Sequence, residues 1–181
     1  MFIERVPSPI GALTCVTLGD TLFTLEFEEN VERVRACLER RGVGLDAVPR
    51  APAKSEIARR IEAYFEGDLG AIEGLAVADH GTPFERRVYA ELRKIPTGEV
   101  VSYSELARRA GRPAAVRAVG ATNAKNPIAI VVPCHRVIGA NGALTGYAGG
   151  VERKQWLLAH EGARRTEKAR ERAVRSRRAH R

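Results

Sequence analysis

The secondary-structure signals in the sequence change at Gly81, and this change constrains the fold of the chain more than any other feature of the sequence. Before Gly81, residues 12–18 and 21–27 are apolar or β-branched runs separated by a Gly-Asp pair, which predicts a β-hairpin. Residues 31–41 and 55–66 carry apolar residues at helical spacing and are each followed by glycine, so we expect two helices there. These signals predict an α/β domain over residues 1–80.

After Gly81, helix signals dominate. Thr82 to Glu85 form a capping box with proline at the first helical position, and Pro96 ends that helix. A second capping box at residues 102–105 starts a short helix that ends at Gly111, and Pro113 opens another helix that reaches about residue 124. Two short helices joined by a glycine turn are typical of a helix-turn-helix. We therefore predict a mostly α-helical domain over residues 81–163.

Two more elements are expected near the end of this domain. Residues 128–132 are continuously apolar, which predicts a short, fully buried strand. A glycine-rich loop at residues 145–150 then precedes a last helix over about residues 151–160.

The net charge of +8 is distributed unevenly along the chain. Residues 1–80 carry a net charge of −5, residues 81–163 carry +6, and the tail over residues 164–181 carries +7. An anionic polymer such as nucleic acid would therefore meet the second domain and the tail. We expect the tail to be disordered or a frayed helix. The alternative to a tail that meets nucleic acid is a charge run that is merely solvated.

Composition excludes several classes of protein. With 181 residues, 44% of them hydrophobic and 29% charged, the chain is globular and large enough to need no disulfide staple. Its three cysteines are an odd number without CxxC spacing, which argues against a disulfide scaffold and a Cys₄ zinc site. No apolar run approaches the roughly 20 residues of a membrane span. We expect a protein without a membrane partner in the cytoplasm, or on the nucleoid if the source is bacterial.

Cys134 differs from the other two cysteines in its neighbours. Cys15 and Cys37 lie on the predicted strand and helix, as small buried hydrophobes do. Cys134 follows a buried segment and Pro133, and the next residue, His135, could take its proton if a carboxylate orients the imidazole. An inert buried thiol beside a structural histidine is the alternative. No second ligand stands at zinc-finger spacing, so neither a metal nor a cofactor is expected.

The second half of the chain resembles the O6-alkylguanine-DNA alkyltransferases, also called methylated-DNA–protein-cysteine methyltransferases. The resemblance rests on NPIAIVVPCHRV at residues 126–137, GYAGG at 146–150, KQWLLAHEG at 154–162, GEVVSYSELA at 98–107 and RAVG at 117–120. SPIG at residues 8–11 extends the likeness into the first domain, so it covers about residues 2–162. The resemblance implies a ribonuclease-H-like N-terminal domain and a winged-helix-like C-terminal domain.

The same resemblance implies direct reversal of DNA damage. Cys134 would take the alkyl group from O6 of a flipped-out guanine, and O4-methylthymine is a second conceivable substrate. The thioether would not be regenerated, so each molecule would act once. The partner would be double-stranded DNA carrying O6-alkylguanine and approached from the minor groove. The free protein would be a monomer, and cooperative assembly on DNA is left open.

Individual residues carry over from the family motifs by position. His135 would generate the thiolate through a water, Glu161 would orient the imidazole, and Asn126 would join the recognition helix to the active-site segment. Tyr103 and Arg117 would push a phosphate and fill the gap left by the flipped nucleotide. The remaining predicted residues are small residues of the recognition helix (Ala118, Gly120 and Ala121) and the wall of the base pocket (Val137, Tyr147, Ala148 and Gly149).

Three other functions stay open at this point: a non-catalytic binder of alkylated DNA, a helix-turn-helix transcription regulator and a Cys-His-Glu hydrolase. The binders related to the family lack the reactive cysteine, and a hydrolase needs an oxyanion hole that the sequence does not reveal. Two residues depart from the common family pattern, Tyr89 and Thr97, where many members carry tryptophan and tyrosine.

Overall fold

The computed structural model describes residues 1–163, which form two compact units. Unit 1 comprises Met1–His80 and Pro127–Val131, and unit 2 comprises Gly81–Asn126 and the chain from Val132 onward. The expectations for the basic tail fall on residues 164–181 and lie outside the described part. Within that part, no helix is long and apolar enough to cross a membrane.

Unit 1 is built on a three-stranded antiparallel sheet. Strands β1 (Phe2–Val6), β2 (Leu13–Leu18) and β3 (Thr21–Phe27) lie in the order β1-β2-β3. The predicted hairpin is β2 and β3, with Leu18 opposite Thr21 and Gly19 in the left-handed conformation that the tight turn requires. Every residue of β3 after Thr21 is buried, which indicates that both faces of this strand are covered.

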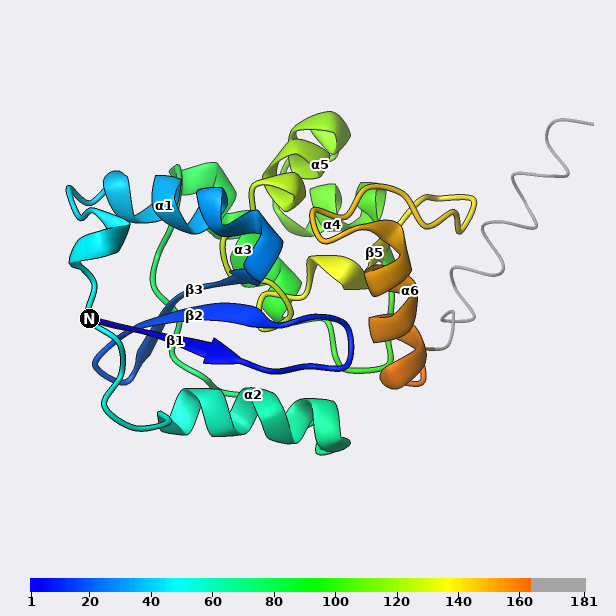
Figure 1. Cartoon of the computed structure of the whole chain (residues 1–181). Helices are drawn as coiled ribbons and strands as arrows, with labels where there is room; N and C mark the ends of the chain where they lie inside the picture. Colours follow the sequence, from blue (N-terminus) through cyan, green and yellow to red (C-terminus); the bar gives the residue numbers. More distant parts are fainter. Residues whose placement is uncertain (164–181) are drawn as a thin grey trace, which may run out of the picture. The chain divides into compact units, whose positions relative to one another are not determined.

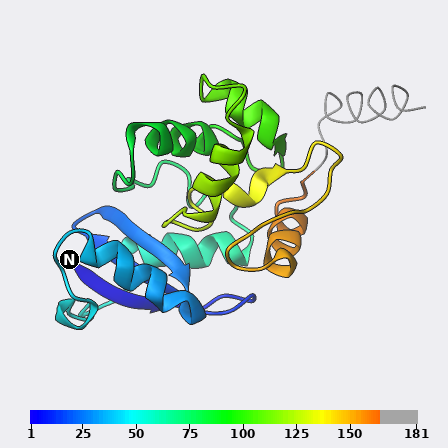
Figure 2. The same ribbon diagram turned by 90° about the horizontal axis from the view of Figure 1, so that it is seen from above.

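Two helices cover opposite faces of this sheet (Figures 1 and 2). Helix α1 (Val31–Glu39) packs on β3, and helix α2 (Glu56–Glu66) packs on β1. Short 3₁₀ turns, η1 (Glu28–Asn30) and η2 (Leu45–Ala47), flank α1. Ser55 caps α2 through its side chain, and Gly67, at a φ of 112°, ends it as the glycine pattern predicts.

Residues 128–132 are buried as predicted, but they do not form a strand. Only Ile128 pairs with β3, through a bridge to Leu25. The chain then turns at Ile130, whose φ of 71° is a strained conformation for a β-branched residue. The apolar run correctly indicates burial, but a run of this length does not distinguish a strand from a buried turn between two prolines.

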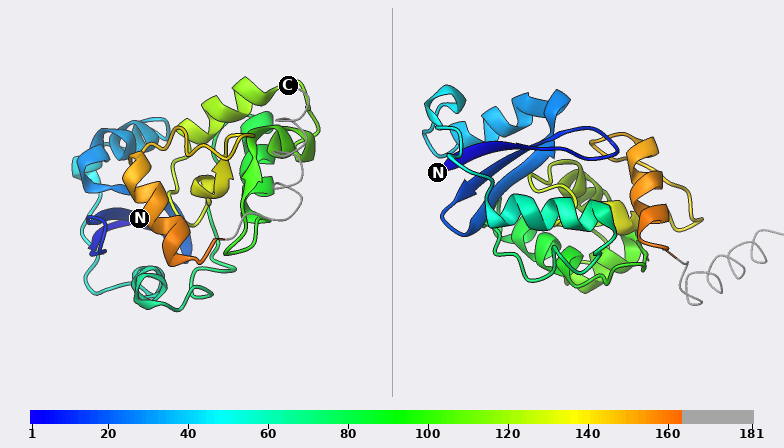
Figure 3. Two further views of the ribbon diagram at one scale, coloured as in Figure 1. Left: turned by 90° about the vertical axis from the view of Figure 1, so that its right-hand side faces the viewer. Right: turned by 60° about the horizontal axis from the view of Figure 1, so that its bottom comes forward.

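Unit 2 contains four helices among the described residues (Figure 3). Helix α3 (Pro83–Arg93) starts with the predicted capping box, in which both hydrogen bonds are present. Helix α4 (Tyr103–Arg109) packs on α3 and on α5 (Val116–Ala124), and Ser102 caps its first turn. Residues 113–115 form a turn, so the prediction that α5 begins at Pro113 is wrong by three residues.

The last helix and a small sheet complete unit 2. The 3₁₀ turn η3 (Cys134–Arg136) runs directly into strand β5 (Val137–Ile138), which pairs in parallel with β4 (Val101–Ser102). Helix α6 (Val151–His160) packs against η3. The cysteine turn is therefore fixed by strand pairing on its C-terminal side and by a helix packed against it.

Candidate functional site

Cys134 lies at the first position of η3, where Pro133 ends the preceding segment. The residue is buried, with 7% of its surface exposed. The Asn126 amide donates hydrogen bonds to Cys134 Sγ over 3.2 Å and to the Val132 carbonyl over 2.8 Å. A donor aimed at the sulfur stabilises a thiolate more than a thiol, because the hydrogen bond to an anion is stronger.

His135 is fully buried, and one of its ring nitrogens is held by Glu161. The distance from His135 Nε2 to Glu161 Oε1 is 2.9 Å. Burial alone would raise the pKa of Glu161, but hydrogen bonds and charges from His135 and Arg136 outweigh it and hold that pKa well below its usual range. The carboxylate is therefore ionised and can only accept, which places the imidazole proton on Nε2.

The other ring nitrogen, His135 Nδ1, is buried and has no hydrogen-bond partner among residues 1–163. Burial lowers the pKa of His135, Glu161 raises it in part, and the cations of Arg136 and Lys154 lower it further. The imidazole is consequently neutral near pH 7, with its basic lone pair on Nδ1. A neutral histidine with an available Nδ1 can accept a proton.

Arg136 is a functional residue that the sequence reasoning missed. Its guanidinium is buried and donates to both carboxylate oxygens of Glu161, over 2.9 and 2.8 Å. It also donates to the Ile95 carbonyl over 2.6 Å and to the Thr97 hydroxyl over 3.1 Å. A two-pronged arginine fixes the plane of the carboxylate, and with it the direction of the imidazole. Its place directly after His135 was the available signal.

Lys154 is the second residue that sequence reasoning missed. This ammonium is fully buried on α6 and donates to the carbonyls of Val137 and Thr145, over 2.6 and 2.9 Å. Burial lowers the pKa of Lys154 to about 8, while the charge of Cys134 raises it. The lysine thereby ties the glycine-rich loop to β5, beside the cysteine turn. Its signal was a charge on the otherwise inward-facing side of the last helix.

The predicted pocket residues lie in this loop and in β5. The ring of Tyr147, which is half-buried, lies edge-on to the His135 ring with centroids 6.5 Å apart. Gly149 is buried and its carbonyl accepts from Arg153, whereas Ala148 is exposed. Val137 is buried in β5, and its contact with Lys154 runs through its backbone. The structure thus brings Tyr147 to the histidine.

The predicted DNA-contacting residues lie on α4 and α5. Arg117, Ala118 and Ala121 are exposed, and Gly120 is half-buried beneath the Tyr103 ring, which stands 4.0 Å from the position a Cβ would take. The Arg117 side chain forms no ion pair or hydrogen bond with the described residues. By contrast, Glu105 binds Arg108 and Arg109 over 2.7 and 3.1 Å, so these two basic residues are already partly neutralised.

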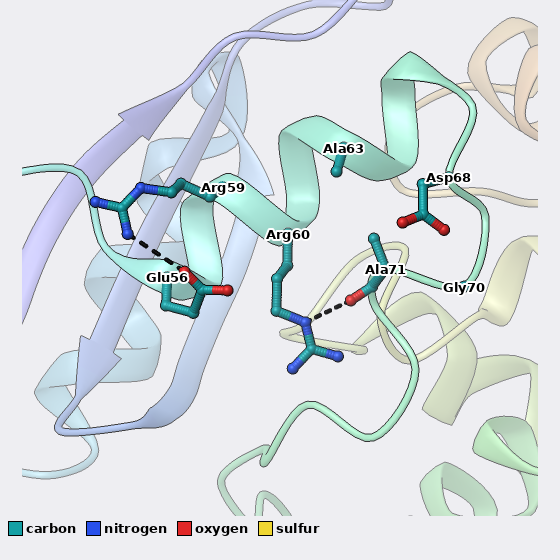
Figure 4. A pocket seen from close by; sticks show the side chains of 7 residues that line it. All are labelled: Glu56, Arg59, Arg60, Ala63, Asp68, Gly70 and Ala71. Atoms are coloured by element: carbon teal, nitrogen blue, oxygen red, sulfur yellow. Dashed lines mark hydrogen bonds and ion pairs between the residues drawn. The ribbon is translucent and has the colours of Figure 1, made fainter.

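Unit 1 contains a hollow of about 460 Å³ beside α2 (Figure 4). Its arginines are already engaged, because Arg59 pairs with Glu56 and Arg60 donates to the backbone carbonyls of Ala71 and Glu73. None of the predicted site residues lines it. Within residues 1–163 there is also no group of three or more side chains arranged to hold a metal ion.

Comparison with known proteins identifies the family. Residues 83–163 match the family model described as "6-O-methylguanine DNA methyltransferase, DNA binding domain". The methylated-DNA–protein-cysteine methyltransferase of Shigella flexneri is 48% identical over 164 residues, which cover 88% of this chain and 94% of that protein. The protein of the same name from Mycolicibacterium paratuberculosis is 46% identical over 158 residues, covering 87% of this chain and 90% of the relative.

A solved structure agrees with these relatives. The crystal structure of Mycobacterium tuberculosis OGT in complex with DNA superposes with a TM-score of 0.78 at 41% identity, covering 90% of this chain and 93% of that one. The mixed α/β unit and the helical unit are therefore the fold of an OGT alkyltransferase. The chain belongs to the methylated-DNA–protein-cysteine methyltransferase family.

Proposed function

We propose that this protein repairs DNA by transferring a methyl or larger alkyl group from O6 of guanine to Sγ of Cys134. The observation that carries the proposal is the arrangement around this sulfur: the Asn126 amide donates to it, and the neighbouring His135 is held by an ionised Glu161. This set of groups generates and stabilises a thiolate nucleophile. The relatives named above carry the same activity in their names.

The reaction is a single displacement. His135 Nδ1 takes the thiol proton, directly or through a water, and Glu161 stabilises the resulting imidazolium. The thiolate attacks the alkyl carbon, so the C–S bond forms as the bond from carbon to O6 breaks. The electron pair of that bond moves to O6 and into the purine ring, which takes up a proton and becomes guanine. The alkyl group stays on the sulfur as a thioether and the thiol is not regenerated, so each molecule reacts once. O4-methylthymine offers the same alkyl–oxygen bond.

The damaged base must leave the stack before it can reach Cys134, because a stacked guanine does not let a rigid sulfur line up behind the alkyl carbon. We assign duplex DNA to the surface of α5, approached from the minor groove. Exposed Ala118 and Ala121 allow a helix to approach a narrow groove closely, and Arg117 has no competing partner within the described residues. Tyr103 would displace the phosphate, and Tyr147, Ala148, Gly149 and Val137 would surround the base.

Domain roles follow from this assignment. Unit 2, which contains every proposed site residue, would bind DNA and react, and we infer a winged-helix-like relationship for it. We infer a ribonuclease-H-like relationship for the sheet and helices of unit 1. The free protein would be a monomer that works where the DNA lies, in the cytoplasm or on a bacterial nucleoid.

Mass spectrometry after incubation with an O6-methylguanine oligonucleotide tests the proposal. The expected result is one added methyl group per molecule, mapped by peptide analysis to Cys134. A binder or a transcription regulator would gain none, and a hydrolase would release methanol without being modified. An unmodified Cys134 with an unmethylated protein would refute the proposed function.

A further inference from the structure

Strand β3 is hydrogen-bonded to the buried segment that directly follows Asn126. The Leu25 N–H donates to the Pro127 carbonyl over 3.0 Å, and the Ala129 N–H donates to the Leu25 carbonyl over 2.7 Å. The Thr24 hydroxyl donates to the same Pro127 carbonyl over 2.6 Å, and Thr24 is only 1% exposed. One carbonyl of this segment therefore accepts two hydrogen bonds from β3.

These two donors leave Pro127 with little backbone freedom. The proline ring fixes φ, and a carbonyl held by two donors from one strand fixes ψ. The residue before a proline avoids helical angles, so the backbone of Asn126 is restricted as well. The Thr24 hydroxyl consequently helps to set the direction in which the Asn126 side chain leaves the chain.

The Asn126 side chain closes the turn that carries the nucleophile. Its amide nitrogen donates to Cys134 Sγ over 3.2 Å and to the Val132 carbonyl over 2.8 Å. The chain between these groups passes through Ile130, whose φ of 71° is strained for a β-branched residue. A strained turn keeps one shape only where surrounding contacts determine it. The hydrogen bonds from β3 to Pro127 are such contacts, at the N-terminal side of the turn.

We propose that Thr24 is a positioning residue for the reaction at Cys134. Its hydroxyl fixes the Pro127 carbonyl, and the Asn126 amide is thereby held within hydrogen-bond distance of the sulfur. A donor at the sulfur favours the thiolate over the thiol, so loss of the Thr24 hydroxyl should lower the ionised fraction of Cys134. This inference rests on the proposed function, and it gives unit 1 a part in a reaction whose other assigned residues all lie in unit 2.

Variants at residue 24 test whether the hydroxyl itself matters. Thr24→Val keeps the volume and the branching but removes the hydroxyl, whereas Thr24→Ser keeps the hydroxyl and removes a methyl group. The first measurement is the ultraviolet absorbance of the Cys134 thiolate through a pH titration, with Cys134→Ser as the baseline. Cys15 and Cys37 stay protonated near neutral pH, because burial raises the pKa of both thiols, that of Cys15 to about 12. The second measurement is the single-turnover rate of methyl transfer from duplex O6-methylguanine.

The hydroxyl and the methyl group should have separate effects. In Thr24→Val we expect the midpoint of the Cys134 titration to rise by about half a pH unit, and methyl transfer below that midpoint to slow about threefold. Thr24→Ser should match the unchanged protein in both measurements, even though the loss of a buried methyl group lowers its stability. Thr17→Val is the matched control, because it removes another buried hydroxyl of the same sheet, from β2, whose pairing partners are β1 and β3.

Several outcomes would overturn the inference. An unchanged midpoint and an unchanged transfer rate in Thr24→Val would do so, and equal losses in Thr24→Val and Thr24→Ser would assign Thr24 to packing alone. If Thr24→Val does not fold, Thr24→Ala and Thr24→Ser still form a pair that differs only in the hydroxyl, and equal midpoints in that pair would also contradict the inference. Absence of any methyl transfer by the unchanged protein would instead refute the proposed function, while the titration would still report whether Thr24 acts on the sulfur.

Discussion

At the scale of single residues, Glu161 links the general base to a permanent cation. Its two oxygens receive His135 Nε2 and the guanidinium of Arg136, so one carboxylate sets both the proton position and the orientation of the imidazole. Arg136 also keeps Glu161 ionised, because it stabilises the charged form of the carboxylate. A lone histidine beside a cysteine thereby becomes a base with a defined tautomer.

Replacement of the nucleophile separates chemistry from binding. Cys134→Ser should abolish methyl transfer, because the serine hydroxyl has a far higher pKa than a thiol and His135 cannot ionise it. Affinity for duplex DNA should stay within about twofold, since the proposed DNA contacts lie on α4 and α5. Transfer assays with radiolabelled DNA and gel-shift titrations check the two parts. Retained transfer in this variant would place the nucleophile elsewhere.

The burial of His135 should make the free energy of unfolding depend on pH. Burial holds the pKa of His135 below the value of about 6.5 for a free imidazole, so between these two values the unfolded chain binds a proton that the folded protein does not. The free energy of unfolding should therefore fall as the pH is lowered below about 6.5. Urea denaturation of the unchanged protein and of His135→Gln isolates this contribution from that of His80, whose pKa is also lowered by burial. Parallel pH curves for the two proteins would contradict the expectation.

At the scale of elements, helix ends with local chemical signals were predictable, whereas features that depend on distant partners were not. The capping box at Thr82 and the glycine at residue 67 fix their helix ends through neighbouring atoms, so sequence alone suffices. Strand β1 went unpredicted, because its pairing with β2 depends on partners 7 to 15 residues away. The turn at Ile130 contradicts local preference altogether, since only surrounding structure holds a β-branched residue at that φ.

The residues of the candidate site also differ in whether the sequence alone could identify them. Cys134, His135 and Glu161 are identifiable from motif resemblance, because each stands in a recognisable string of residues. Lys154 begins one of the same strings, but its role depends on burial that the chain reaches only after folding. A lysine on a helix is ordinarily exposed.

Helix α5 carries a prediction of its own. If Arg117 occupies the space of the extruded nucleotide, Arg117→Ala should slow repair of duplex O6-methylguanine by about tenfold or more, because the flipped state loses its support. Reaction with the free base O6-benzylguanine requires no flipping and should be unchanged. Paired rate measurements on these two substrates decide the matter. An equal loss on both would mean that Arg117 acts on the pocket or on folding.

At the scale of the whole molecule, the net positive charge and the proposed functional residues lie in the same part of the chain. The net charge is −5 over residues 1–80 and +6 over residues 81–163, and every proposed DNA contact lies in the second range. Long-range attraction would therefore orient the protein with unit 2 toward an anionic polymer, and salt would weaken that orientation. Residues 164–181 add a further +7 directly after residue 163.

Deletion of residues 164–181 tests whether this tail contributes to binding. The deletion removes a net charge of +7 and leaves Cys134, His135 and Glu161 unchanged. The logarithm of DNA affinity falls with the logarithm of salt concentration by about 0.9 per phosphate contacted, so a tail that lies along the duplex steepens this dependence. The truncated protein should bind more weakly at low salt, with a slope smaller by several units. Its rate with free O6-benzylguanine should match that of the full chain, because that reaction involves no phosphate. Equal slopes for the two proteins would mean that the tail is solvated without contacting DNA.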